Sequence, residues 1–352
     1  MSQTPLSPPR PNAFVALLSR AGLDWFLLAL LGVVGLAYWQ PSLGSKASPM
    51  PWHLITTVGV ALVFFFYGLK LNLEKLREGM RNWKLPIVVQ LATFVLFPAL
   101  ALLAKPLFGT EGDMLWQSIF FLCALPSTVS TSVVMVSIAG GNLPAAIFNA
   151  SLSSLLGIVL TPLLTSVFLH TGTGGSQLWG LATQLLWQVV LPVGAGILLN
   201  SRFGALVDRH KSALRYFDQF TILLIVFTAF CESFAEGIFR SYEPADIVKL
   251  SAGMMGLYLL AFALIWGLGR VLNFSRADNI VAVFCGSKKS LVHGSVMASL
   301  LFPAGATGLI LLPLMLYHAL QIILASSMAQ YLGRQTALIA SSATQSGLGI
   351  NK

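Results

Sequence analysis

Long apolar stretches alternate with short polar links along nearly the whole chain of 352 residues. A bilayer core about 30 Å thick requires roughly 20 apolar residues in helical form. Ten stretches meet this requirement, so the pattern predicts an all-α membrane protein with ten spans. The predicted spans are Leu23–Trp39, Leu54–Leu71, Trp83–Phe108, Gln117–Ala139, Leu143–Leu169, Trp179–Leu199, Tyr216–Ala235, Val248–Leu272, Asp278–Phe302 and Ala306–Leu332.

The two ends of the chain lie outside this apolar pattern. Residues 1–22 are polar and rich in proline, and they lack the small-residue cleavage site that follows the apolar core of a signal peptide. Residues 333–352 are polar and rich in small side chains, a composition that predicts disorder. The transmembrane domain is therefore expected at residues 23–332, between two cytoplasmic segments.

The scarcity of charged residues supports the membrane class. Asp, Glu, Lys and Arg make up 9% of the chain, whereas soluble domains carry about a quarter. The formal net charge is +9, but the basic residues are spread over the links, so no nucleic-acid partner is expected. Cys123, Cys231 and Cys285 lie singly in apolar stretches, which indicates neither a disulfide framework nor a metal site.

The basic residues also indicate an orientation, because cytoplasmic links of membrane proteins carry an excess of Lys and Arg. With the N-terminus in the cytoplasm, only four of the 21 basic residues fall in outer links: Lys46, Lys105, Arg240 and Lys249. Two more, Lys288 and Lys289, lie within the ninth span, and all the others face the cytoplasm. Both termini are thus expected inside.

Ten spans divide into two halves, at about 23–169 and 179–332, and the fourth span of each half is interrupted. Pro126 precedes a run of hydroxyl side chains, and Gly286 precedes a run with two lysines and a histidine. Unwound backbone is tolerated at membrane depth only where it is buried in protein or lines a cavity. Matched breaks in two halves indicate a carrier whose solute site lies at the repeat interface.

The polar residues around the two breaks are the candidate solute-binding residues. Two residues of the fifth span join them because they are four positions apart and share a helix face. Ordinary hydrogen bonding between helices is the alternative for each residue taken singly. The candidates are Ser127, Thr128, Ser130, Thr131, Ser132, Asn149, Ser153, Ser287, Lys288, Lys289, Ser290 and His293.

The two lysines of the ninth span are the most unusual of these residues. A cation at the bilayer centre costs about 2.5–3.5 kcal/mol even on the gentlest scale, so intramembrane lysines are functional by default. Adjacent residues differ by about 100° on a helix, which leaves one lysine facing the cavity unless the segment is unwound. Lys289 and His293, four apart, would share a face. Pairing with carbonyl groups or a buried carboxylate is the alternative interpretation.

Three stretches resemble the bile acid/sodium symporter family, and in particular its bacterial members akin to the orphan vertebrate member. They are FFFYGLKLNLEKL, ALPSTVSTSVVMVSIAGGNLPAAIFNASLSSLLG and LILLPLMLYHALQIILASSMA. The resemblance covers about Leu23 to Leu332. It implies ten helices in two inverted five-helix repeats, a panel and a core domain, broken fourth and ninth helices that cross, and a bacterial inner-membrane location.

The sodium ligands of that family carry over only in part. Gln90 matches the glutamine of the third helix, and Thr131 and Ser132 fall where the fourth helix supplies Ser-Asn. The resemblance therefore implies these three as the ion-coupling residues. The glutamate of the ninth helix has no counterpart, because the stretch FCGSKK contains no carboxylate. Sodium coupling, proton coupling and uncoupled transport stay open, and sodium independence is the prediction.

The leading interpretation is a secondary transporter of a small, anionic organic solute that works by alternating access without a cofactor. An intramembrane enzyme is the second, since Ser287 beside Lys288 could form a nucleophile pair, although adjacent side chains point apart on a helix. A channel or a sensor is the third, and paired helix breaks favour a carrier over a channel. The sequence has neither an HExxH nor a GxxxxGK[ST] motif. Solute and lipid are the expected partners.

Overall fold

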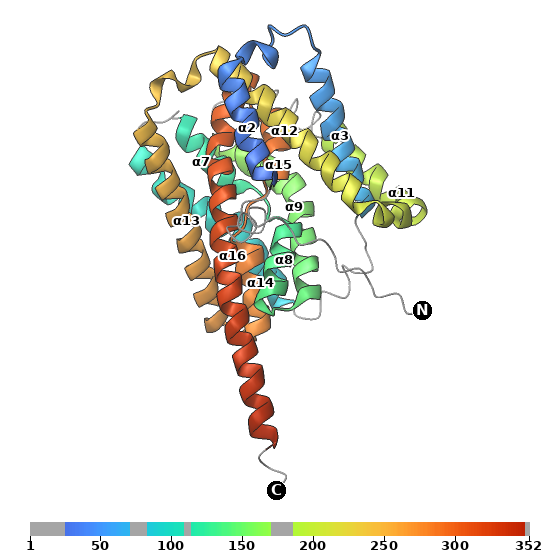
Figure 1. Cartoon of the computed structure of the whole chain (residues 1–352), viewed down its shortest axis with the longest axis vertical. Coiled ribbons are helices and arrows are strands. Elements are labelled where there is room, and N and C mark those ends of the chain that lie inside the picture. Colours follow the sequence, from blue (N-terminus) through green and yellow to red (C-terminus); the bar gives the residue numbers. More distant parts are fainter. Residues whose placement is uncertain (1–24, 71–82, 109–113, 170–185, 349–352) are drawn as a thin grey trace, which may run out of the picture.

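The computed structural model describes residues 25–70, 83–108, 114–169 and 186–348, and the regular structure within these ranges is helical. The predicted N-terminal segment lies outside the described residues, as do the first residues of the sixth predicted span. The helices form an elongated bundle, and α16 runs along most of its long axis to the C-terminal tip (Figure 1).

The two halves of the chain contribute corresponding sets of helices. The first half contains α2 (Trp25–Trp39), η1 (Pro41–Leu43), α3 (Trp52–Lys70), α5 (Lys84–Leu91), the π turn η3 (Ala92–Leu96), α6 (Phe97–Ala104), η4 (Lys105–Phe108), α7 (Met114–Ala124), α8 (Ser130–Ala139) and α9 (Leu143–Leu169). The second contains the π turn η5 (Leu186–Val190), α11 (Leu191–Arg209), α12 (Lys211–Ala235), η6 (Ile238–Ser241), α13 (Pro244–Val271), α14 (Arg276–Gly286), α15 (Leu291–Leu301) and α16 (Ala304–Leu348).

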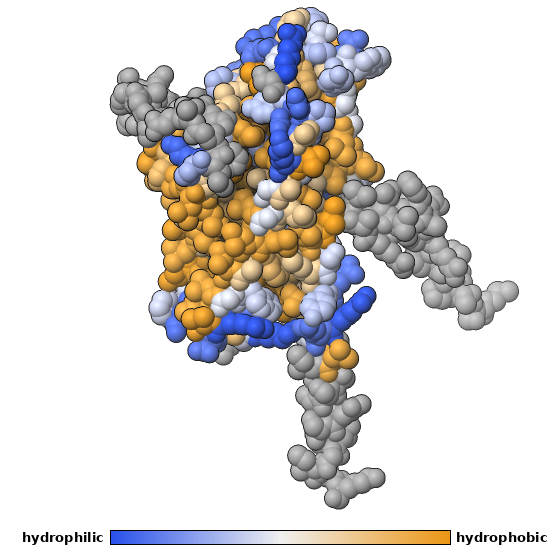
Figure 2. Space-filling model, turned by 90° about the vertical axis from the view of Figure 1, so that its left-hand side faces the viewer, coloured by the Kyte–Doolittle hydropathy of each residue, from blue (hydrophilic) through white to orange (hydrophobic). Residues whose placement is uncertain are grey.

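The helices confirm a protein that crosses a membrane several times. Among the described residues, six helices are long and apolar enough to cross a bilayer: α3, the composite of α5, η3 and α6, α9, α12, α13 and α16. The other predicted spans overlap shorter helices or pairs of half-helices. Figure 2 shows a broad belt of apolar side chains between two hydrophilic ends. This belt is the surface that lipid would cover.

The last helix is longer than the sequence predicts. α16 continues past Leu332 to Leu348, so the prediction of disorder was wrong for residues 333–348. Tertiary contacts support the first turn of this extension, because the Arg276 guanidinium donates to the Leu332 carbonyl at 3.1 Å and to the Gln335 side-chain oxygen at 3.2 Å. Composition alone cannot report such a contact.

The two halves pack in corresponding ways. α2 and α3 are the first two spans of one half, and α11 and α12 are the first two of the other. α2 packs against α12 and α3 packs against α11, which is the same contact with the halves exchanged. Since each half contains five spans, the second half enters the membrane from the opposite side, so the repeats are inverted. We call α2, α3, α11 and α12 the panel, and the other helices the core.

Two glycines bring α3 and α11 into close contact. A Cβ at Gly68 would collide with the Val193 carbonyl oxygen, and a Cβ at Gly196 would collide with the Phe65 carbonyl oxygen. Small residues at such positions let the backbones of membrane helices approach each other. The panel is therefore closely packed along this contact, and two cavities lie where the panel meets the core.

Candidate functional site

The two broken helices meet at a backbone hydrogen bond. Residues 125–129 separate α7 from α8, and residues 287–290 separate α14 from α15. The Ser290 N–H donates to the Pro126 carbonyl oxygen at 2.9 Å, which places one break directly against the other. Proline disfavours the helical conformation of the residue before it, so the first break begins just ahead of Pro126. Both predicted interruptions and their crossing are confirmed.

Side chains of neighbouring helices bind the backbone groups that the second break exposes. Gln321 accepts the Lys289 N–H and donates to the Lys289 carbonyl, both at 2.9 Å. The Tyr317 hydroxyl donates to the Ser287 carbonyl at 2.6 Å. Unpaired backbone groups are costly at membrane depth, and these contacts from α16 remove that cost.

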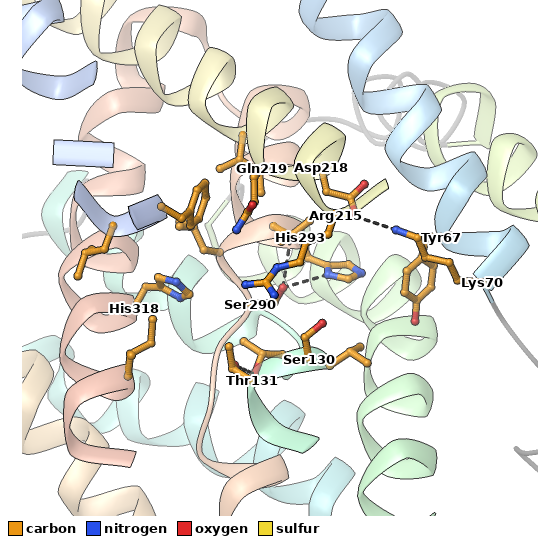
Figure 3. Close-up of a pocket in the computed structure, with 18 of the residues that line it drawn as sticks. Tyr67, Lys70, Ser130, Thr131, Arg215, Asp218, Gln219, Ser290, His293 and His318 are labelled. Atoms are coloured by element: carbon orange, nitrogen blue, oxygen red, sulfur yellow. Dashed lines mark hydrogen bonds and ion pairs between the residues drawn. The ribbon is translucent and has the colours of Figure 1, made fainter. Parts of the chain in front are cut away.

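A cavity of about 290 Å³ lies beside the crossing, between the core and the panel helices α2, α3 and α12. Figure 3 shows side chains that line it. Residues from both breaks and from the first turns of the helices that follow them form one wall. Five predicted solute-binding residues belong to this wall: Thr128, Ser130, Thr131, Ser290 and His293.

Two half-helices begin at this cavity. Ser130 and Thr131 open α8, Leu291 and Val292 open α15, and all four line the cavity. The first N–H groups of a helix have no intrahelical partner and carry the positive end of the helix dipole. Val129 at the start of α8 provides no side-chain cap. The N-termini of two helices therefore lie at the cavity wall, and at α15 the Ser290 hydroxyl accepts the His293 N–H.

The hydroxyl and imidazole groups of this wall are linked to one another. Thr131 Oγ1 donates to Thr128 Oγ1 at 2.8 Å, and Thr128 Oγ1 lies 2.8 Å from Ser132 Oγ. Ser290 Oγ lies 3.1 Å from His293 Nδ1. His293 is buried, and its Nε2 has no hydrogen-bond partner. His293 thus lines the cavity with a ring that carries one buried, unpaired nitrogen.

The opposite wall contains charged residues that the sequence analysis did not identify as site residues. Tyr67 and Lys70 come from α3, and Arg215, Asp218 and Gln219 come from α12. The Lys70 ammonium and the Asp218 carboxylate form an ion pair at 2.8 Å. From the sequence, Lys70 and Arg215 indicated only the orientation of the chain in the membrane, since they lie near the ends of predicted spans. Their position opposite the breaks results from the packing of the panel against the core.

Lys289 does not line the cavity, although it was predicted to bind the solute. Its ammonium group is fully buried and donates to the carbonyl oxygens of Thr93, Cys123 and Leu125 at 2.9, 2.7 and 2.8 Å. The expectation that Lys289 and His293 share a helix face was wrong, because the backbone is non-helical as far as residue 290. Pairing with carbonyl groups, the alternative interpretation, holds for this residue.

The remaining predicted residues lie behind the crossing and do not line the cavity: Ser127, Ser132, Asn149, Ser153, Ser287 and Lys288. Several have structural partners. The Ser127 N–H donates to Ser153 Oγ at 3.0 Å, and the Ser287 hydroxyl donates to the Val283 carbonyl at 2.7 Å rather than to Lys288. Lys288 is fully buried, and its Nζ makes no hydrogen bond.

The three residues expected to couple an ion are not gathered at the cavity. Gln90 donates to the Asn149 carbonyl of α9 at 3.2 Å and does not line the cavity. Thr131 lines the cavity, whereas Ser132 does not, and its Oγ lies 2.8 Å from Thr128 Oγ1. No group of three or more His, Cys, Asp or Glu side chains suited to a metal ion occurs in the part of the chain that the structure describes.

A second cavity, of about 490 Å³, lies at the opposite end of the boundary between panel and core. Glu232 lines this second cavity, and its carboxylate forms an ion pair with the Lys46 ammonium at 2.9 Å. Ile222 of α12 lines the first cavity, and Ile225 lines the second. These two isoleucines are fully or almost fully buried and lie one helical turn apart, so a thin apolar layer separates the cavities.

Comparison with known proteins gives consistent results. The family model described as the SBF-like CPA transporter family matches residues 24–334. The chain is 41% identical to an uncharacterized protein of Pseudomonas aeruginosa, over 89% of this chain and 93% of the relative. It is 38% identical to "Putative symporter YfeH" of Escherichia coli, over 89% and 94%. It is 33% identical to sodium/bile acid cotransporter 7 of Danio rerio, also over 89% and 94%.

Proposed function

This chain belongs to the SBF-like CPA transporter family, and we propose that it is a secondary carrier that moves a small organic anion by alternating access. The names of two relatives, a putative symporter and a sodium/bile acid cotransporter, support transport as the activity. The anionic class of the solute rests on the cavity at the helix crossing, and in particular on the two helix N-termini that line it.

The convergence of the α8 and α15 N-termini on one cavity is the observation that carries this proposal. A helix N-terminus binds anions because its free N–H groups and its dipole both favour negative charge. In carriers with interrupted helices, such ends face the anionic group of the solute near the bilayer midplane. Two of them at one cavity support a carboxylate or a similar group as the ligand.

The charged side chains of the cavity support the same solute class. Lys70 and Arg215 contribute two positive charges, and Asp218 contributes one negative charge. Asp218 is paired with Lys70, and the Arg215 guanidinium lines the same cavity. Figure 3 shows the Arg215, Ser290 and His293 side chains among those that line the cavity. A small anion would combine these groups with the donors of the half-helices.

The same arrangement supports transport without sodium. In the described part of the chain, no acidic side chain lies in either break, and the second break carries two lysines. Two unit charges about 4 Å apart interact by about 4 kcal/mol at an effective dielectric of 20, so a nearby ammonium group would strongly weaken sodium binding. Of the two lysines, Lys288 is our choice for a group that takes up or releases a proton, because its Nζ makes no hydrogen bond, whereas Lys289 is held by carbonyl groups.

The two cavities support alternating access in a defined orientation. The first opens where α3 ends and α12 begins, which is the cytoplasmic side if both termini lie inside, as the basic residues indicate. The second then faces the outside. We place the protein in a bacterial inner membrane, in line with its bacterial relatives. Movement of the core against the panel would open one cavity while it closes the other.

A ligand screen followed by reconstitution tests the proposed function. Purified protein is mixed with a library of small anions, cations and neutral metabolites, and thermal unfolding is recorded, since a ligand that binds the folded state raises the unfolding temperature. We expect hits among anions, and we expect Arg215→Gln to weaken them. Uptake of the best hit into proteoliposomes should saturate with concentration. Hits confined to cations or neutral compounds, or uptake that never saturates, would refute an anion carrier.

The sodium prediction uses the same proteoliposomes. Sodium is replaced by a bulky organic cation at fixed pH and voltage, and uptake is expected to persist. Lys288→Gln should then change the dependence of uptake on pH. Collapse of uptake without sodium would overturn sodium independence while leaving the carrier assignment intact.

A further inference from the structure

The Lys289 ammonium group is enclosed by ligands from two other segments of the chain, the third span and the end of α7. It donates to the carbonyl oxygens of Thr93, Cys123 and Leu125 at distances between 2.7 and 2.9 Å. It also lies 4.2 Å from the ring centroid of Phe97. Carbonyl oxygens that replace a hydration shell, together with an aromatic face, are the groups with which proteins bind monovalent cations.

The backbone exposes these oxygens for reasons that do not involve the lysine. Thr93 belongs to a π turn, in which a carbonyl pairs with the N–H five residues later. For Thr93 that residue is Pro98, which has no N–H. Cys123 and Leu125 lie at the C-terminal end of α7, where the last carbonyls lack an intrahelical partner and carry the negative end of the dipole. The oxygens would therefore require a donor or a cation whatever residue stood at position 289.

The charge of Lys289 is held without a carboxylate. Among the described residues, no Asp or Glu forms a salt bridge with it. The neighbouring Lys288 is equally buried, but its Nζ makes no hydrogen bond. The two adjacent lysines therefore have different surroundings. The Lys289 ammonium is coordinated by carbonyl oxygens as a bound ion would be, whereas Lys288 Nζ has no such ligands.

We propose that these carbonyl groups and the Phe97 ring form a cation site that the Lys289 ammonium occupies permanently. When this side chain is shortened, the site binds a free small monovalent cation instead. Because its cation is attached to the chain, the protein needs no dissolved ion at this position to hold α7, the third span and the second break together. This cation site acts on the stability of the fold, so thermal unfolding tests it whether or not the protein carries the proposed solute.

The test uses full-length Lys289→Ala, which removes the ammonium and leaves space in front of the three oxygens. Thermal unfolding is measured in methylammonium, potassium, sodium and choline chloride at equal ionic strength. Methylammonium reproduces the end of the lysine side chain, whereas choline is too bulky for the site. The variant should unfold at a lower temperature than the wild type in choline. Methylammonium should raise that temperature in a saturable manner, as expected for a ligand of the folded state.

Three proteins serve as controls. The wild type should show no difference between methylammonium and choline, because its site is filled. Lys288→Ala should show none, because that lysine has no carbonyl shell. Lys289→Met fills the space without a charge, so it should be destabilised and should not respond to cations. A response of Lys289→Ala that matches any of these controls overturns the proposal.

A second measurement covers the case in which Lys289→Ala does not survive purification in choline. Membranes that contain the tagged variant are extracted in each of the four salts, and the monodisperse fraction is measured by fluorescence-detected size-exclusion chromatography. Recovery in methylammonium but not in choline supports the cation site. Equal recovery in all four salts, or no recovery in any of them, overturns it.

Discussion

The Ser290 N–H donates to the Pro126 carbonyl oxygen at 2.9 Å, and this bond joins the two interrupted helices at their crossing. Ser290 has a second role, since its hydroxyl accepts the His293 N–H at 3.3 Å and so caps α15. The same hydroxyl lies 3.1 Å from His293 Nδ1. One residue therefore fixes the crossing, the start of a half-helix and the orientation of a cavity side chain.

Ser290→Ala and Ser290→Pro separate these roles. The alanine variant keeps the crossing bond and loses the cap, so we expect the free energy of unfolding to fall by about 0.5–2 kcal/mol. Solute affinity should fall too, because His293 loses a partner. The proline variant also loses the N–H of the crossing bond and should unfold at a lower temperature than the alanine variant.

Ser275→Ala is the matched control, because Ser275 Oγ caps α14 by accepting the Asp278 N–H at 3.1 Å and does not line the cavity. It should lose similar stability and keep its solute affinity. Equal stability of the two Ser290 variants would contradict a role for the crossing bond.

Thr131→Val tests the hydroxyl groups of the cavity. Valine keeps the volume of threonine and removes the hydroxyl that donates to Thr128 at 2.8 Å. We expect the solute identified by the ligand screen to bind more weakly by about 0.5–3 kcal/mol. Thr221→Val is the control, because the Thr221 hydroxyl donates to the Phe217 carbonyl within its own helix and does not line the cavity. Equal affinities of Thr131→Val and the wild type, measured by calorimetry, would mean that the Thr131 hydroxyl only bonds Thr128 and does not contact the solute.

Gly196→Ala tests the close contact between α3 and α11. A methyl group at Gly196 would meet the Phe65 carbonyl oxygen, so the helices must separate, and overpacking of this kind costs about 1–3 kcal/mol. Gly194 lies on the same helix with no atom within 4 Å of an added Cβ, so Gly194→Ala should be neutral or slightly stabilising. The unfolding temperature should therefore fall clearly in Gly196→Ala and should stay the same or rise slightly in Gly194→Ala. Similar shifts would argue against a close panel contact.

Glu232→Gln tests whether the ion pair beside the second cavity holds the link between α2 and α3 against α12. The Glu232 carboxylate raises the pKa of Lys46 by hydrogen bonding and by charge. The Lys46 ammonium therefore stays charged into alkaline pH, and the ion pair is lost only above the ordinary titration range of lysine. The glutamine variant removes one charge of a partly exposed pair, an effect of at most about 1 kcal/mol, or about fivefold in an opening equilibrium.

The thiol of Cys231 can report when Gly44 separates from α12. Cys231, next to Glu232 in the sequence, is fully buried and faces Gly44. An impermeant maleimide should label Cys231 up to about fivefold faster in Glu232→Gln than in the wild type. Cys123 and Cys285, which are buried in the core, are internal controls whose labelling should not change. Peptide mass spectrometry distinguishes the three sites. Unchanged labelling of Cys231 would contradict a role for this pair in holding the α2–α3 link against α12.

The parts of the fold that depend on local sequence were predictable. A run of about 20 apolar residues crosses a bilayer as a helix, because no other conformation pairs its own backbone groups in lipid. Pro126 and Gly286 interrupt two such runs for equally local reasons, so the breaks and their matched positions were visible in the sequence. The family resemblance added the crossing, which the Ser290–Pro126 bond confirms.

The roles of individual site residues were not predictable in the same way. Lys288 and Lys289 are adjacent and chemically identical, and periodicity on an assumed helix gave the wrong partner for Lys289. Its actual ligands come from three positions at least 164 residues away in the chain. Only the folded core brings them to the ammonium group, because an unwound segment has no helical period from which a direction could be inferred.

The sequence by itself therefore determined that the chain is an inverted-repeat membrane protein with two interrupted helices and an excess of basic residues on one side. Local hydrophobicity and helix breakers fix those features. The tertiary structure alone decided that Lys70, Arg215 and Asp218 face the breaks, that Lys289 is coordinated by carbonyl groups, and that α16 continues past Leu332. Each of these depends on packing between segments distant in the chain, which no local pattern of residues records.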